Sequence, residues 1–331
     1  MKRREVITLL GGAAASPLLR PLAARAQRPA LPMVGFINGG SADVYARELA
    51  AFRQGLNETG YVEGQNVTVE YHWLGGKFDQ MPELAADLVR RRVAVIVTPA
   101  NSPGALAAKA ATTTIPIVFG VSQDPVQLGL VASLARPGGN ATGVNFFTQE
   151  VAAKRLRLLH DLVPKAVRVA VLVNPVVASI TETTIRDVQQ AAATIGLQIQ
   201  ILNASTIGEI DTAFAMLARE RADALFVAPS AFFTSRRGQF ATLAARARIP
   251  AAYSQRDLVE SGGLMSYGTD LADMFRQVGV YTGRILKGAK PAELPVLQST
   301  KFEFVINLQT ARALGIDVPP AVLSIADEVI E

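Results

Sequence analysis

The sequence predicts an α/β protein with two doubly wound lobes, each built on a parallel sheet. Short apolar runs alternate with longer segments whose apolar residues recur at helical spacing, which is typical of parallel strands covered by helices on both faces. The turn Gly139–Gly143 interrupts this alternation, which then starts again. A closed barrel of alternating strands and helices is the structural alternative, and the central interruption favours two lobes.

Length and composition agree with this fold class. The 331 residues, of which 50% are hydrophobic, are sufficient for two domains with complete cores. The absence of cysteine excludes disulfides, thiolate nucleophiles and cysteine-based metal sites. Beyond the first residues, no apolar run is long enough for a membrane-spanning helix, so we expect no insertion of the mature chain into a membrane.

We expect four strand-and-helix units in the first half. Each expected strand is followed by small or polar residues; these strands are Met33–Asn38, Asn66–Trp73, Val93–Val97 and Ile115–Gly120. The expected helices are Asp43–Thr59, Asp79–Arg92, Ser102–Thr112 and Gln127–Leu134. Ser102 stands before Pro103, so we expect it to cap the third of these helices.

The same unit recurs in the second half, without a repeated residue motif that would indicate a solenoid. The expected strands are Arg168–Val173, Leu197–Leu202, Ala224–Val227, Ile249–Ser254 and Leu264–Tyr267. The expected helices are Gln149–Val163, Ser179–Ile195, Ile207–Arg221, Arg236–Ala247 and Met274–Lys287.

Residues 1–26 have the pattern of an export signal. A basic segment, Lys2–Arg4, precedes the short apolar run Val6–Ala15, and Ala24–Ala26 is a small-x-small cleavage site. The paired arginines are compatible with either the Sec or the twin-arginine route, so we expect a periplasmic protein. This segment carries a net charge of +4 out of the +5 of the whole chain, which leaves +1 for the mature chain. The basic pI therefore gives no reason to expect nucleic-acid binding.

Small polar loops follow most of the expected strands. In open α/β sheets, ligands bind outside the carboxyl ends of the strands, often at the N-terminus of the next helix. The loop Thr98–Ser102 is therefore either a cradle for a carboxylate or simply a helix cap. No arginine stands at an expected strand end, which argues against highly anionic ligands.

The motifs of several enzyme classes are absent. The sequence has no glycine-rich dinucleotide fingerprint, no phosphate-binding loop and no nucleophile elbow. Its two histidines, His72 at a strand end beside Trp73 and His160 at a helix end, are expected to be structural or surface residues, and Asp124, with no histidine beside it, is the one acid at a strand end of the first lobe. We therefore expect no catalytic residues, no metal and no cofactor. An exported α/β enzyme stays as the alternative, and it would require a catalytic pair at the strand ends.

Several motifs, in this order, resemble one protein family. They are INGG, TPA, IPIVFGVSQDPVQLGLVASLARPGGNATGV, GGLMSYGTD, ILKGAKPAELPV and FVINLQTARALGIDVPPAVLSIADEVI. Together they are similar to the ABC-transporter substrate-binding proteins of the tryptophan/tyrosine-binding type, over about Pro32 to Glu331. A sugar-repressor type of sensor shares the fold, but its DNA-binding helices would stand where this chain has residues 1–26.

The resemblance implies a type I periplasmic-binding-protein fold, in which crossover strands join two lobes. The first lobe would hold residues 32–145 and 269–300, and the second residues 146–268 and 301–331. The ligand would be a small organic solute, an amino acid or an amino-acid-like compound, with aromatic ones among the candidates. The partner would be an ABC permease in the inner membrane, with no nucleic acid involved.

The resemblance also implies which residues contact the ligand. They are Asn38, Thr98, Ala100, Ser122 and Asp124 in the first lobe, Asn145 at the first crossover, and Asn174, Pro229, Tyr253 and Tyr267 in the second lobe. Asp124 would hold the ammonium group of an amino acid or, alternatively, cap the next helix. Tyr253 or Tyr267 would stack on an aromatic ligand or, alternatively, pack in the core of the sheet.

Overall fold

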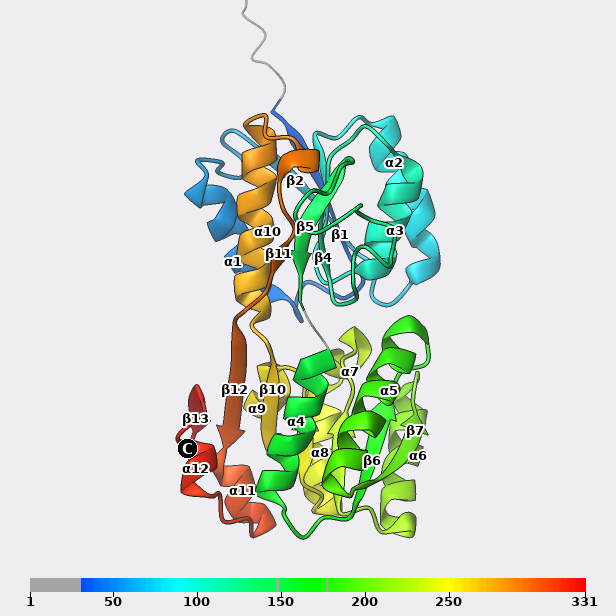
Figure 1. Ribbon diagram of the computed structural model, residues 1–331, viewed down its shortest axis with the longest axis vertical. Helices are drawn as coiled ribbons and strands as arrows, with labels where there is room; N and C mark the ends of the chain where they lie inside the picture. Colours follow the sequence, from blue (N-terminus) through cyan, green and yellow to red (C-terminus); the bar gives the residue numbers. More distant parts are fainter. Residues whose placement is uncertain (1–30, 147–148, 177) are drawn as a thin grey trace, which may run out of the picture. The chain divides into compact units, whose positions relative to one another are not determined.

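Two separate β-sheets organise the protein (Figure 1). The computed structural model describes residues 31–331 except 147–148 and 177. The export signal expected at residues 1–26 lies outside the described residues. Residues Leu31–Glu331 form one compact unit, and none of the helices described within it is long and apolar enough to span a membrane.

The first sheet has six parallel strands in the order β2-β1-β3-β4-β5-β11. The strands are β1 (Met33–Asn38), β2 (Thr68–Trp73), β3 (Val95–Thr98), β4 (Ile117–Val121), β5 (Ala141–Asn145) and β11 (Leu297–Gln298). The helices that accompany them are α1 (Ala46–Glu58), η1 (Phe78–Gln80), α2 (Met81–Arg90), α3 (Ser102–Ala111), α10 (Leu271–Leu286) and η2 (Pro291–Glu293).

The second sheet has seven strands in the order β7-β6-β8-β9-β10-β12-β13. Its strands are β6 (Arg168–Val173), β7 (Gln198–Asn203), β8 (Ala224–Val227), β9 (Ala251–Tyr253), β10 (Met265–Thr269), β12 (Phe302–Asn307) and β13 (Glu328–Ile330). Strand β12 runs antiparallel to β10, and the other neighbours are parallel. The helices are α4 (Gln149–Leu162), α5 (Ala178–Ile195), α6 (Ile207–Glu220), α7 (Ala231–Ser235), α8 (Arg237–Ala247), α9 (Arg256–Glu260), α11 (Leu308–Leu314) and α12 (Pro320–Leu323).

Helices cover both faces of each sheet, which explains the continuous apolar strands. In β1, Phe36 packs in the core under α1 and α10, whereas its neighbour Ile37 packs in the core under α2 and α3. In β6, Val171 and Leu172 likewise face two different cores. The predicted α/β fold class with two lobes is confirmed, and two separate sheets exclude the closed barrel.

The chain passes between the two sheets three times. It leaves the first sheet after β5, returns after β10 to form α10 and β11, and leaves again for β12. Helix α10 packs closely on α1: a Cβ atom at Gly279 would lie 2.2 Å from the carbonyl oxygen of Phe52. The division into residues 32–145 with 269–300 and residues 146–268 with 301–331 stays our proposal for the lobes.

One predicted helix is wrong. The segment 127–134 forms turns, and Gly129 there has a φ of 71°, in the left-handed region. The amide of Leu128 donates to the carbonyl of Asp124 and the amide of Leu130 to that of Pro125, so a single turn forms before Gly129 redirects the chain. The expected turn Gly139–Gly143 is also wrong in part, because Ala141–Gly143 belong to β5. No separate strand or helix was predicted beyond Lys287, where the structure has β11, β12, β13, α11 and α12.

Candidate ligand-binding site

Both sheets have the same strand order around a point where the direction of strand addition reverses. In the first sheet this point lies between β1 and β3, and in the second between β6 and β8. The helices that follow the two central strands there cover opposite faces of the sheet, which leaves a crevice outside the strand ends.

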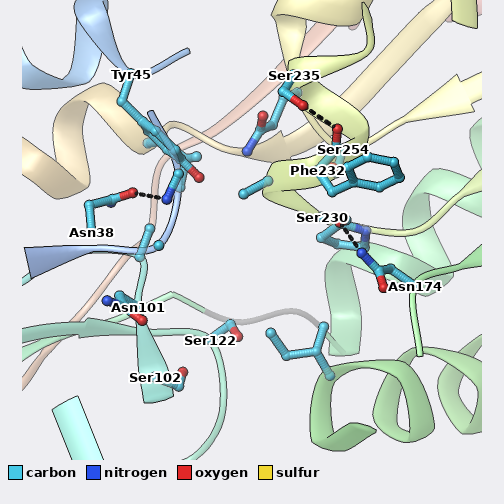
Figure 2. A pocket seen from close by; sticks show the side chains of 18 of the residues that line it. Asn38, Tyr45, Asn101, Ser102, Ser122, Asn174, Ser230, Phe232, Ser235 and Ser254 are labelled. Carbon is cyan, nitrogen blue, oxygen red and sulfur yellow. Dashed lines mark hydrogen bonds between the residues drawn. The ribbon is translucent and has the colours of Figure 1, made fainter. Parts of the chain in front are cut away.

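A cavity of about 410 Å³ is lined by residues from both of these crevices. This volume lies within the range of small-molecule sites. In Figure 2, Asn38, Tyr45 and Asn101 lie on one side of it, and Asn174, Ser230 and Phe232 lie on the other.

Asn38 fixes the loops of the first sheet that border the cavity. Its Nδ2 donates to the carbonyl of Pro99 at 2.9 Å, and its Oδ1 accepts from the amide of Gly40 at 2.7 Å. The side chain is 1% exposed, so these bonds replace the water that it loses on burial. The loops after β1 and β3 are therefore joined directly.

Asn101, not Ser102, caps helix α3. Its Oδ1 accepts from the amide of Gly104 at 3.0 Å, and its Nδ2 donates to the carbonyl of Ile37 at 3.3 Å. Ala100 adopts a φ of 52°, which turns the chain into this cap. The expected cap was therefore one residue too late, because a carboxamide can serve the helix and β1 at once. The hydroxyl of Ser102 lines the cavity and donates to Oε1 of Gln123 at 2.5 Å.

Asn174 organises the opposite wall. Its Nδ2 donates to Oγ of Ser230 at 3.2 Å, and its Oδ1 accepts from the amide of Val176 at 3.1 Å. The ring of Phe232 follows on α7, with the guanidinium of Arg236 at 5.8 Å from the ring centroid. The wall of the second sheet thus combines a polar strand end with an aromatic ring.

Tyr45 supplies an aromatic surface on the first wall. Its ring stacks on those of Trp73 and Phe275, with interplanar angles of 18° for both pairs. It is only 5% exposed, and burial raises the pKa of its hydroxyl. A Cβ atom at Gly40 would lie 2.5 Å from this ring, so a glycine is required there. Phe78 and Phe146 also line the cavity.

Five of the residues predicted from the sequence line this cavity, and five do not. Asn38, Ala100, Ser122, Asn174 and Pro229 are in the lining. Those outside the lining are Thr98, Asp124, Asn145, Tyr253 and Tyr267. Their roles in ligand binding stay predictions.

The polar residues outside the lining have structural partners or are buried. Asp124 accepts from the amide of Val126 at 2.8 Å and so closes a local turn, and the helix that it was expected to cap does not form. Asn145 donates to the carbonyls of Val121 and Gln123 at 3.1 and 2.8 Å. Thr98 is 0% exposed within β3.

The two tyrosines outside the lining pack in the second lobe. Tyr253 is 0% exposed and makes an edge-on contact with Phe240, with ring centroids 6.2 Å apart. Tyr267 stacks on Phe302, with centroids 6.1 Å apart. Core packing, the alternative to stacking on a ligand, is the contact that the structure shows for both rings.

Reasoning from strand ends missed the cavity residues that come from helices. Arg155 on α4 lines the cavity and is 1% exposed, and burial lowers the pKa of its guanidinium to about 9. Its Nη1 donates to the carbonyl of Tyr267 at 3.4 Å, and the guanidinium lies 4.3 Å from the ring centroid of Phe226. The sequence held a signal for it, since Arg155 falls at helical spacing between the apolar residues Ala152 and Leu159.

The chemistry of the lining is that of a binding site. It contains hydroxyls, carboxamides, aromatic rings and two arginines, and its described residues include no histidine and no carboxylate. Among the residues that the structure describes, no group of acids and histidines is placed to hold a metal ion.

The family profile described as "ABC transporter substrate binding protein" matches residues 34–330, which is nearly the whole described chain. The chain belongs to this family. The resemblance found in the sequence is thereby confirmed, and so is the role of a substrate-binding protein of an ABC transporter.

The descriptions of two similar proteins mention an aromatic amino acid. A tyrosine-binding protein of Clostridioides difficile (strain R20291) is 27% identical over 263 residues, which are 80% of this chain and 75% of that protein. The crystal structure of an ABC domain in complex with L-Trp, from Streptococcus pneumonia, superposes with a TM-score of 0.82. Its identity is 26%, and the match covers 91% of this chain and all of the other.

A further solved structure shares the fold. The ligand-free, open structure of a substrate-binding protein with adhesive properties from Clostridium difficile gives a TM-score of 0.66 at 24% identity, over 91% of this chain and 99% of that one.

Proposed function

We propose that this protein is exported to the periplasm, binds an aromatic amino acid or a close analogue, and delivers it to an ABC permease in the inner membrane. The observation that supports the ligand class is the cavity lined by aromatic rings outside the strand ends of the two sheets. Tyr45 lies on one wall of this cavity and Phe232 on the other. An aromatic ligand would find flat apolar contacts on both sides. The relatives named for tyrosine and L-Trp support the same class.

Polar groups around the rings would orient the ligand. Hydroxyls of Ser102, Ser122 and Ser230 and the carboxamide of Asn174 line the cavity with the aromatic side chains. A few placed polar groups on a mainly apolar surface are what selective small-molecule sites use. Binding between two walls on different sheets also supplies a reason for closure, because a ligand held by both walls stabilises their approach.

A thermal-shift screen of the chain from Gln27 onward tests the ligand class. L-Tryptophan, L-tyrosine, L-phenylalanine and aliphatic amino acids are compared at equal concentrations, and we expect the aromatic set to raise the melting temperature. A ligand at 100 times its dissociation constant adds about 2.7 kcal/mol to the free energy of unfolding. Stabilisation by aliphatic amino acids alone would contradict the aromatic ligand class.

A pair of variants tests whether the ligand binds in this cavity. Phe232→Ala removes a cavity ring, so we expect weaker binding of the aromatic ligand by calorimetry. Leu106→Ala on α3 is the control, since Leu106 is 40% exposed and does not line the cavity. Equal losses of affinity in both variants would place the ligand elsewhere.

N-terminal sequencing of the exported protein tests the export signal. The sequence should begin at or near Gln27, and a retained Met1 would contradict export with cleavage.

A further inference from the structure

Arg155 is a buried cation without an acidic partner. It is 1% exposed, its single hydrogen bond among the described residues goes from Nη1 to the carbonyl of Tyr267, and its Nε has no partner there. A guanidinium has five N–H donors, so most of its hydrogen-bonding capacity is unused. Yet this side chain lines the ligand cavity.

Two half-buried arginines, Arg256 and Arg276, are paired with carboxylates. Arg256, for example, contacts the carboxylates of Glu260, Glu303 and Glu328 at 2.7, 2.5 and 2.8 Å. Burying a charge is costly unless it is paired and hydrogen-bonded. The ring of Phe226 under the guanidinium offsets part of this cost, but it leaves the in-plane donors free.

The charged residues in the described lining of the cavity are all cationic. Arg155 and Arg236 are the charged residues in its described lining, and no acid is among them. A ligand group that enters next to Arg155 is therefore favoured if it is anionic and able to accept from a fork of N–H donors. A carboxylate fits that fork in a bidentate manner. The hydroxyl-bearing Thr184, 3% exposed, also lines the cavity from the neighbouring helix α5.

We propose that Arg155 anchors the carboxylate of the ligand at the α4 wall of the cavity. This assignment rests on the proposed function in that it uses the same cavity, and it sets the chemical class of the ligand as a monocarboxylate. The ligand then completes the ion pair that the empty protein lacks. Tyr45 and Phe232 contact the remainder of the molecule.

The test compares acids with the amines that lack the carboxylate. L-Tryptophan is paired with tryptamine, L-tyrosine with tyramine and L-leucine with isopentylamine, and each is titrated into the wild-type protein and into Arg155→Met. Methionine keeps the long apolar stem and removes the charge. We expect wild type to bind the acid of a pair at least about tenfold more tightly than the amine, and Arg155→Met to lose this preference.

Stability of the empty protein separates an anchor from a structural arginine. An unpaired buried cation replaced by an apolar side chain should leave the melting temperature unchanged or higher. Arg157→Met is the matched control: Arg157 lies on the same helix, is exposed and does not line the cavity, so neither affinity nor melting temperature should change. A lower melting temperature of Arg155→Met with its acid preference intact would assign Arg155 to packing and overturn the anchor.

The outcomes also separate this proposal from the aromatic ligand class. If tryptamine binds wild type as tightly as L-tryptophan, the anchor is overturned while the aromatic cavity stands. If only L-leucine binds and isopentylamine does not, the anchor stands and the aromatic class is overturned. If no acid of the panel binds, both are overturned. The comparison of acid with amine uses wild type alone, so an absent acid preference overturns the anchor even if Arg155→Met fails to fold.

Discussion

Glu48 makes the stability of the protein depend on pH in a direction opposite to that of most carboxylates. It lies on α1, is 7% exposed, and lines a small cavity together with Arg47 and Asp257. Burial is the largest cause that raises the pKa of Glu48, from 4.5 to about 7, and the charges of Asp257 and Asp270 add to it while Arg47 opposes it. The protonated carboxyl is therefore favoured in the folded protein.

The sign and size of this pH dependence follow from proton linkage. Between pH 4.5 and about 7, the folded state binds more protons at Glu48 than the unfolded state does, so the free energy of unfolding falls as the pH rises through this window. One pH unit corresponds to about 1.4 kcal/mol, and the difference between the two pKa values therefore amounts to about 3 kcal/mol. This contribution is fully lost above the folded pKa.

Glu48→Gln is uncharged at every pH and should remove this dependence. We expect the variant to match wild type near pH 4 and to exceed it by about 3 kcal/mol at pH 8, measured by urea denaturation at a series of pH values. Glu182→Gln on α5 is the control, since Glu182 is exposed and should show no such trend. A difference between Glu48→Gln and wild type that is the same at pH 4 and pH 8 would refute the reasoning.

Three further changes test packing, capping and the strand-end acid. Gly279→Ala forces a Cβ against the carbonyl of Phe52 and should lower the free energy of unfolding by about 1–3 kcal/mol or more. Gly238→Ala, which has open space at its Cβ, should not lower it. Equal effects of the two variants in thermal denaturation would contradict the close contact of α1 with α10. Thr206→Ala removes the acceptor for the amide of Glu209 in the capping box of α6 and should cost about 1 kcal/mol, and no loss in urea denaturation would mean that the box is not formed in solution. Asp124→Asn keeps an acceptor for the amide of Val126, so we expect an unchanged melting temperature. The ammonium contact predicted from the sequence would give an affinity loss of about tenfold, and unchanged affinity would leave Asp124 with a role in the turn only.

Local pattern in the sequence was sufficient for the strands and for part of the site. The expected strands β1 and β6 have the same bounds in the structure, because a fully buried parallel strand is a continuous apolar run with an abrupt polar end. The strand-end residues Asn38 and Asn174 line the cavity for the same reason. These features depend on neighbours in the chain.

Features that depend on distant segments were not predictable in this way. Arg155 reaches the cavity from α4 and Tyr45 from the turn before α1, and the orientation of both side chains depends on how these helices pack on the sheets. Strand β11 has two residues and exists only because β5 offers it an edge. Tyr253 and Tyr267 show the reverse: both were expected at strand ends, but Tyr253 is fully buried and Tyr267 lies within β10, partly buried against the core.

The three passages between the sheets also govern when folding can be completed during synthesis. The first sheet has five of its six strands once Asn145 has been made, but α10 begins only at Leu271, 126 residues later. At about 5–20 residues per second, the ribosome needs roughly 6–25 s for that interval. Throughout it, the core residues Phe36 and Phe52 lack the helix that covers them. The second sheet waits in turn for β12 and for β13, which begins at Glu328 of 331 residues. We therefore expect the first half to protect its backbone amides from exchange only after α10 has been made, and the second half only after β13 has been made.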